Sequence, residues 1–344
     1  MVVFGEPLPG GALGVARVAA FVAVVAGAAL LTRTAGDDAA KLPEPQRRMP
    51  RMVGGAVAAL ALLACAGAVR AAPDPPLEGF RLIDQGPSGG TVWSGRIPNP
   101  FVPADTRDAD VYLPPGYTST ARYPVLYLLH GFWGAPSSFV VSLRLADKAD
   151  SLIRSGSARP FIVVMPPGGL PSGSKRERAA SEWAGVWEDY VTRTVVPWVD
   201  AHLPSIRKAR NRAIAGVSAG GYGAVDIALR HVGVFGVAES WEGYFHALRD
   251  GPFASASPAT LAAHDPVLLA RKEAPAIRRS GLQFFLSTGG SHAAVKRRWT
   301  FDFGRELHSL GIAERVWAQP PGVPGFGRNQ LGAALTYAEP VAAG

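Results

Sequence analysis

The stretch Asn211-Arg-Ala-Ile-Ala-Gly-Val-Ser-Ala-Gly-Gly-Tyr-Gly-Ala224 decides the fold, because it places a serine inside a GxSxG pentapeptide between a strand-like and a helix-like run. A strand that turns abruptly into a helix needs positions without a Cβ. Gly216 and Gly220 supply them, so the hydroxyl of Ser218 can stand clear of the backbone. The first free N–H groups of the following helix, beginning at Ala219, can hold an oxyanion. Ser218 is therefore the candidate nucleophile.

A second element, upstream in the chain, complements this serine. The stretch Tyr123-Pro-Val-Leu-Tyr-Leu-Leu-His-Gly-Phe-Trp-Gly134 is typical of a buried parallel strand that runs out into a His-Gly-Phe turn. Such a turn can supply the other half of an oxyanion hole, and the backbone N–H of Phe132 is the candidate donor. We interpret His130 as a structural residue that shapes the loop, with a catalytic role as the alternative.

These segments resemble the putative-esterase branch of the α/β-hydrolases, which includes the esterase D, enterochelin-esterase and antigen 85 mycolyltransferase types. The likeness runs from about residue 106 to residue 337. The matching stretches are Asp110-Val-Tyr-Leu-Pro-Pro-Gly-Tyr117, Tyr127-Leu-Leu-His-Gly-Phe132, Trp187-Glu-Asp-Tyr190 with Val196-Pro-Trp-Val199, and Gly216-Val-Ser-Ala-Gly-Gly221. The resemblance implies an α/β-hydrolase fold with Ser218 as nucleophile and with Phe132 and Ala219 as oxyanion donors.

The rest of the expected triad is not matched. In this group the acid follows a strand downstream of the nucleophile, and the histidine follows the last strand. The acid should come after Leu282-Gln-Phe-Phe-Leu-Ser-Thr288, but Gly289-Gly-Ser-His292 stands there and no carboxylate appears until Asp302. Residues 319–344, where the histidine should lie, contain none. Because a serine hydroxyl is a weak nucleophile without a base, either another residue replaces the histidine or catalysis is weak or absent.

The candidate bases downstream of Ser218 are His231, His246, His264, His292 and His308. We expect surface roles for His231 and His308, near the ends of helices. His246 and His264 lie in loops where substrate pockets form. His292 is the best placed, because it follows the carboxyl end of a strand, where open α/β sheets bind their ligands.

A histidine base needs a group that orients its ring. Glu239 and Glu242 lie near the end of the strand that follows the nucleophile helix. We name Glu239 as the candidate acid, and both residues are equally compatible with solvated loop carboxylates.

The first seventy residues predict export. An uncharged apolar run, residues 52–69, follows a basic segment and precedes small and proline-rich residues, which is typical of a secretory signal. It is also almost long enough to span a bilayer, which takes ~20 residues. An earlier apolar run, residues 18–32, is either a first span or sequence ahead of a start at Met49 or Met52. Under each alternative the C-terminal domain is outside the cytoplasm.

We predict three regions: an N-terminal membrane or signal region at residues 1–72, a linker and domain edge at 73–105, and an esterase-like α/β-hydrolase domain at 106–344. The expected strands are 110–113, 125–129, 161–165, 212–216, 234–239, 282–286 and 315–318, mostly short apolar runs of a mostly parallel sheet covered by helices on both faces. Expected helices include 182–202 and 296–310. The single cysteine, Cys65, lies in the second apolar run as a filler or a lipid anchor, so we expect no disulfide in the domain.

The formal net charge of +8 comes without the basic and aromatic array of a nucleic-acid binder. No metal-ligand spacing or phosphate-binding glycine loop is present, so we predict no metal and no cofactor. Two hypotheses remain. The first is an exported serine esterase or acyltransferase that acts on a small-molecule, lipid or glycan ester and meets the membrane through its N-terminal segment. The alternative is a catalytically inactive binding protein on the same fold.

Overall fold

The computed structural model describes residues 77–103, 107–132, 134–169, 183–249, 253–289 and 294–318, together with residues 2–3 and 6–7. Contacts divide the chain into one unit of Met1–Ala71 and another of Ala72–Gly344. In the first unit, β1 (Val2–Val3) and β2 (Glu6–Pro7) pair antiparallel. The two apolar runs lie outside the described residues. None of the helices in the described ranges has the length and hydropathy needed to cross a bilayer.

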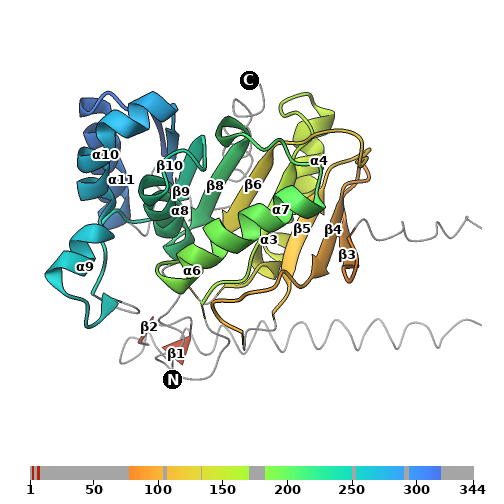
Figure 1. Cartoon of the computed structure of the whole chain (residues 1–344), viewed down its shortest axis with the longest axis horizontal. Helices are drawn as coiled ribbons and strands as arrows, with labels where there is room; N and C mark the ends of the chain where they lie inside the picture. Colours follow the sequence, from red (N-terminus) through yellow and green to blue (C-terminus); the bar gives the residue numbers. More distant parts are fainter. Residues whose placement is uncertain are drawn as a thin grey trace, which may run out of the picture. The chain divides into compact units, whose positions relative to one another are not determined.

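The second unit is built on a nine-stranded sheet in the order β11-β10-β9-β8-β6-β7-β5-β4-β3 (Figure 1). The strands are β3 (Arg81–Gln85), β4 (Thr91–Gly95), β5 (Ala109–Leu113), β6 (Val125–Leu129), β7 (Ile162–Met165), β8 (Arg212–Val217), β9 (Val237–Trp241), β10 (Gln283–Thr288) and β11 (Glu314–Ala318). The six from β6 to β11 pair parallel, whereas β3, β4 and β5 form an antiparallel edge on β7. The carboxyl ends of the parallel strands therefore share one edge.

Helices cover both faces of the sheet. The helical segments are α3 (Ser137–Val141), α4 (Leu145–Arg154), α6 (Val186–Asp189), the π-helix η2 (Tyr190–Val195), α7 (Val196–His202), the 3-10 turn η3 (Ala209–Asn211), α8 (Ala219–Arg230), α9 (Pro258–Ala263), α10 (Pro266–Ser280) and α11 (Ala294–Ser309). Residues of α3 and α4 share one apolar cluster with the sheet. Those of α7, α8, α10 and α11 share the other. The predicted fold class is thus confirmed.

The strand predictions hold best in the buried centre. The bounds of β6 agree with the expected 125–129, whereas β9 begins and ends later than the expected 234–239. Sequence analysis missed β3 and β4, the antiparallel edge strands. In β3 every side chain is exposed or half-buried, so it lacks the continuous apolar run that marks a buried strand.

The expected helix 182–202 begins only at Val186 and contains a π-helical segment, Tyr190–Val195. Pro197 follows at the start of α7. A proline has no N–H to donate to the carbonyl one turn earlier, and a wider turn ahead of it removes the clash with that carbonyl.

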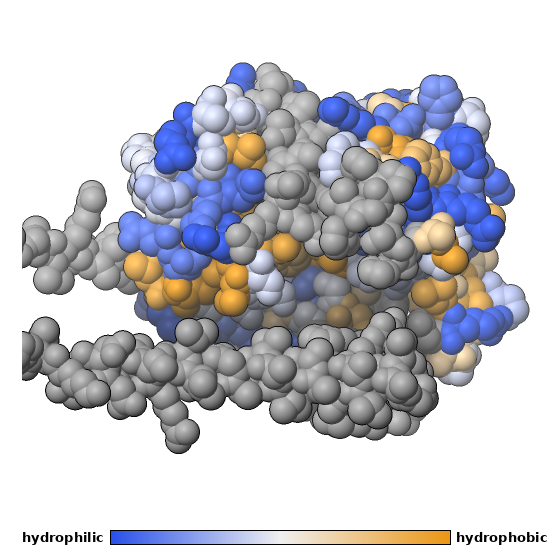
Figure 2. Space-filling model, turned by 180° about the vertical axis from the view of Figure 1, so that it is seen from behind, coloured by the Kyte–Doolittle hydropathy of each residue, from blue (hydrophilic) through white to orange (hydrophobic). Residues whose placement is uncertain are grey.

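Apolar and polar side chains are interspersed over the face shown in Figure 2. Among the residues that the structure describes, the large hydrophobic ones that are exposed are Ile83, Phe132, Val141, Val186, Leu268 and Val295. Two of them lie near the carboxyl edge of the sheet: Phe132 follows β6, and Val295 is in the first turn of α11.

Phe303 holds α11 against the rest of the domain. Its ring is 1% exposed and stacks on Phe245 at 4.4 Å between ring centroids. We expect Phe303→Ala to lower the free energy of unfolding by about 3 to 5 kcal/mol, because it leaves a cavity. Val295→Ala, on an exposed position of the same helix, is the control and should change it by less than about 0.5 kcal/mol. Urea unfolding of both variants measures the difference, and equal losses would contradict the packing role.

Candidate active site

Ser218 stands at a strained turn between β8 and α8. Its backbone has φ 55° and ψ −114°, a conformation that residues with a Cβ rarely adopt. The N–H of Ser218 donates to the carbonyl of Trp241 at 2.8 Å, and its own carbonyl accepts from the N–H of Tyr222 at 3.0 Å. These two bonds hold the turn to the end of β9 and to the first turn of α8. This is the geometry of a nucleophile elbow.

The two glycines of the pentapeptide allow the turn to pack against the end of β6. A Cβ on Gly220 would lie 2.0 Å from the carbonyl oxygen of Leu129, and one on Gly216 would lie 2.3 Å from the carbonyl of Gly220. Neither space admits a methyl group. The sequence-based reason for these glycines, an abrupt turn without Cβ atoms, is therefore confirmed.

The His-Gly-Phe turn lies directly against the elbow. A Cβ on Gly131 would come within 2.9 Å of the Val217 carbonyl and 3.4 Å of the Ser218 Cβ. Phe132 follows this contact, and Ala219 begins α8, whose first N–H groups have no acceptor within the helix. Both residues predicted as oxyanion donors thus adjoin the nucleophile along the chain or across the turn. Their role toward a substrate oxygen stays a prediction.

His130 is part of the wall behind the turn. Its ring is buried, with Nδ1 at 2.9 Å from the carbonyl of Gly131 and Nε2 accepting from the N–H of Gly168 at 3.0 Å. The Nε1–H of Trp183 donates to the His130 carbonyl at 3.0 Å. Burial lowers the pKa of His130 to about 4, so the ring is neutral at pH 7. The interpretation of His130 as a loop-shaping residue is confirmed.

The side chain that meets the nucleophile is a lysine. Nζ of Lys296, in the first turn of α11, lies 3.4 Å from Oγ of Ser218. Among the described residues no other side chain is hydrogen-bonded to this hydroxyl. Sequence reasoning missed Lys296. The available signal was its place at the start of the helix that follows β10, close to the carboxyl edge of the sheet.

Six of the seven histidines lie in the described ranges, and each bonds to a group other than Ser218. Their partners are the loop backbone for His130, the Trp198 carbonyl for His202, Glu188 for His231, Asp265 for His246, Asp226 for His264 and Glu314 for His308. The predicted helix-end positions of His231 and His308 are confirmed. His292, the predicted base, lies outside the described residues.

Glu239, the predicted acid, is fully buried in β9. Its Oε2 accepts from Nε1–H of Trp241 at 2.8 Å, and its Oε1 has no hydrogen-bond partner. Burial raises the pKa of Glu239 well above its ordinary value, and the bond from Trp241 only partly opposes this. Its carboxyl is thus poorly suited to stabilise a cation. Glu242 lies one residue beyond β9, with φ 58° and its N–H donating to the Ser287 carbonyl at 2.9 Å. No described histidine contacts either carboxylate, and their roles stay predictions.

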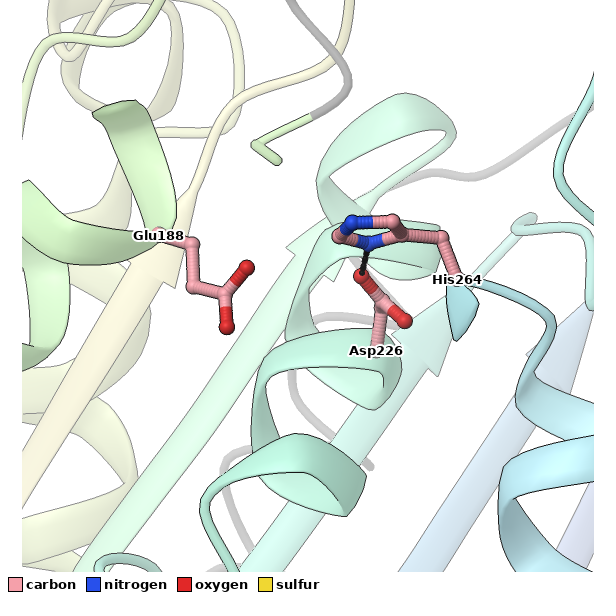
Figure 3. Close-up of side chains that lie close together, drawn as sticks. All are labelled: Glu188, Asp226 and His264. Carbon is pink, nitrogen blue, oxygen red and sulfur yellow. Dashed lines mark hydrogen bonds and ion pairs between the residues drawn. The ribbon is translucent and has the colours of Figure 1, made fainter. Parts of the chain in front are cut away.

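Glu188, Asp226 and His264 are a second group of titratable side chains (Figure 3). One ligand atom from each lies within 4.8 Å of the others, which is compact enough to raise the question of a metal. Nδ1 of His264 and Oδ2 of Asp226 are 2.8 Å apart. Burial raises the pKa of Asp226, and the bond from His264 opposes this.

The partners of Glu188 argue against a cation here. Its Oε1 accepts from Nε of Arg230 at 2.9 Å and lies 2.7 Å from Nε2 of His231. Burial raises the pKa of Glu188, but the bonds from His231 and Arg230 outweigh it, and the pKa is lowered. A metal would have to displace or face the Arg230 guanidinium. We assign the cluster a structural role, because its ion pairs join α6 to α8 and α8 to the residue that ends α9.

A surface groove of about 660 Å³ is lined by Tyr117, Ser119, Arg122 and residues 201–207. It lies beside the bridge between Tyr123 and Ser205, which precede β6 and β8. The groove is therefore at the amino ends of the parallel strands, away from the elbow, and we assign it no part in the chemistry at Ser218.

The parallel sheet, the elbow and the adjoining turn define an α/β-hydrolase-fold protein. Solved structures agree. A ferulic acid esterase superposes with a TM-score of 0.60 at 19% identity, covering 73% of this chain and 98% of its own. An S-formylglutathione hydrolase from Agrobacterium tumefaciens gives 0.58 at 16% identity, covering 75% and 96%. At these identities the likeness concerns the fold.

The family model described as "Putative esterase" matches residues 103–307, more than half of the chain. The chain belongs to this family. It is also 31% identical over 174 residues to an esterase from Mycobacterium tuberculosis, covering 50% of this chain and 36% of that protein. A xylanase/feruloyl esterase from Xylanibacter ruminicola is 36% identical over 133 residues, covering 37% and 18%. The chain thus spans about a third or less of the length of these relatives.

Gly220→Ala tests the close approach of the elbow to β6. The new Cβ would overlap the Leu129 carbonyl, so we expect the free energy of unfolding to fall by about 3 kcal/mol or more. Gly79→Ala, at φ 76° with no atom near its Cβ, is the control and should cost only the backbone strain of about 1 to 2 kcal/mol. Chemical denaturation compares the two variants, and a Gly220→Ala loss no larger than the control would contradict the packing.

The lowered pKa of His130 predicts a pH dependence of stability. Below pH 6.5 the unfolded ring takes up a proton that the folded ring takes up only near pH 4. The stability associated with the neutral ring is therefore complete above pH 6.5 and is lost as pH falls through about 4, at most about 3 kcal/mol. Urea titrations from pH 7.5 to 4 should show a shallower decline in His130→Gln than in wild type. Parallel curves would exclude this residue as the cause.

Proposed function

We propose that this protein is a carboxylic ester hydrolase in which Ser218 attacks the ester carbonyl. The observation that carries the proposal is the strained turn at Ser218, held at φ 55° between β8 and α8. Such strain persists only where surrounding structure maintains it, and here it occurs directly before a helix whose first N–H groups have no acceptor within the helix. Membership of the esterase family supports the same reaction.

In the proposed reaction, Oγ of Ser218 bonds to the carbonyl carbon while a base takes its proton. The carbonyl oxygen becomes an oxyanion, and the backbone N–H groups of Ala219 and Phe132 stabilise it. Collapse of this intermediate releases the alcohol and leaves an acyl-serine, which water then hydrolyses. His292 and Glu239 are the base and acid that the sequence predicts; the first lies outside the described residues, and the second is fully buried with a raised pKa.

The substrate that suits this site is an ester with an apolar or aromatic acyl group. Phe132, beside the elbow, is 44% exposed, and Val295, next to Lys296, is 50% exposed. Exposed apolar side chains next to a nucleophile favour binding of an apolar group. Proteins named as feruloyl or ferulic acid esterases are among the similar ones, which supports an aromatic acyl group.

Two finer proposals rest on the sequence. The apolar run at residues 52–69, with its basic flank, supports export of the domain, retained at or released from a membrane. Transfer of the acyl group to an alcohol in place of water uses the same steps up to the acyl-serine.

A non-catalytic ester-binding protein is the competing function, favoured by the absence of a carboxylate directly after β10.

Ser218→Ala tests the proposed function directly. The full chain should react with a fluorophosphonate probe and hydrolyse p-nitrophenyl acetate, and Ser218→Ala should lose labelling and at least about 10³-fold in kcat/KM. Ser142→Ala, at an exposed serine that ends α3, is the matched control and should behave as wild type. Folded wild-type protein that neither labels nor hydrolyses would favour the binding protein.

A further inference from the structure

We infer that Lys296 is the general base for Ser218, so that the site works as a serine–lysine pair. The inference rests on the proposed function, because it names the residue that activates the proposed nucleophile. Its central observation is the separation of 3.4 Å between Lys296 Nζ and Ser218 Oγ. This is at the outer limit of a hydrogen bond, and such contacts commonly tighten when substrate binds.

No other basic side chain among the described residues is hydrogen-bonded to Ser218. Each described histidine bonds to a group other than Ser218; His231 and His264, for example, bond to Glu188 and Asp226. In the described part of the chain Nζ of Lys296 forms no ion pair with a carboxylate, and its one hydrogen bond is to the Ser218 hydroxyl.

The position of Lys296 in the chain explains how its amine reaches the serine. Lys296 belongs to the first turn of α11, the helix that follows β10, so its side chain starts at the carboxyl edge of the sheet, where the elbow lies.

A serine–lysine pair also explains both unmatched positions of the expected triad. A histidine base requires a carboxylate that selects its tautomer and stabilises the imidazolium. A lysine amine has a single nitrogen and no tautomers, so it needs neither. The glycine at position 289 after β10 and the lack of histidine beyond β11 are then consistent with catalysis. Lys296 of α11 would then take the place of both the histidine and the acid of the expected triad.

The chemistry balances with the groups present. The neutral Lys296 amine accepts the Oγ proton as Oγ forms its bond to the carbonyl carbon and the carbonyl π electrons move to oxygen. The resulting ammonium returns the proton to the alcohol oxygen as the carbon–oxygen bond to it breaks. In deacylation the amine takes a proton from water, hydroxide adds to the acyl carbon, and Oγ leaves with the proton from the ammonium.

The experiment measures hydrolysis of p-nitrophenyl acetate and fluorophosphonate labelling by the full chain. Lys296→Ala and Lys296→Met remove the amine, and Met keeps the apolar stem, so a folding defect is separated from loss of the base. Lys296→Arg keeps the positive charge, but its guanidinium stays protonated and cannot act as a base. His292→Ala tests the competing base. Arg298→Ala, at an exposed neighbouring cation, is the matched control.

We expect kcat/KM to fall about 10²- to 10⁴-fold in all three Lys296 variants and to stay close to wild type in His292→Ala and Arg298→Ala. Added ethylamine should restore part of the activity of Lys296→Ala by supplying the missing amine. Activity retained in Lys296→Met or Lys296→Arg overturns the assignment. If His292→Ala also loses activity, the ethylamine experiment decides between the two bases. Restored activity of Lys296→Ala then supports Lys296 as the base, and no restoration overturns that assignment. An inactive, unlabelled wild type instead overturns the proposed function itself.

Discussion

The close approach of the elbow to the end of β6 is the contact on which the site depends. The Cβ position of Gly220 lies 2.0 Å from the Leu129 carbonyl, so the start of α8 and the His-Gly-Phe turn meet without an intervening side chain. This contact sets the strained conformation of Ser218 and brings Gly131 against it. Every step of the proposed chemistry requires these backbone segments to stay within contact distance.

Buried residues around this contact make it rigid. His130 bridges the turn to the loop after β7 through Gly168, and Trp183 bonds to the His130 carbonyl. Because the ring is neutral and both of its nitrogens face backbone groups, it holds the loop and is not available to take a proton from serine. His130, the histidine of the turn that lies against the elbow, is thus structural. The base must come from another element.

Much of the fold and the strained turn at Ser218 could be predicted from sequence. The buried strands β6 and β8 are continuous apolar runs, and the glycines around Ser218 have one geometric explanation, so local chemistry was sufficient. The strands β3 and β4 could not be found in this way. Every side chain of β3 is exposed or half-buried, and β4, although mostly buried, contains Thr91 and Ser94 in place of a continuous apolar run. Glu239 illustrates a further limit. Its place at the end of a strand suggested a catalytic acid, but its burial and its bond to Trp241 depend on packing.

The sequence by itself determined the class of protein, the candidate nucleophile Ser218 and the mismatch at two expected triad positions, since each is a matter of residue type at a fixed spacing along the chain. Only the tertiary structure decided which cation meets the serine. Lys296 and Ser218 are far apart in sequence, and they meet because α11 packs beside β10 with its first turn at the carboxyl edge of the sheet. A contact between distant segments depends on how helices pack on the sheet, so it cannot be predicted from a local sequence pattern.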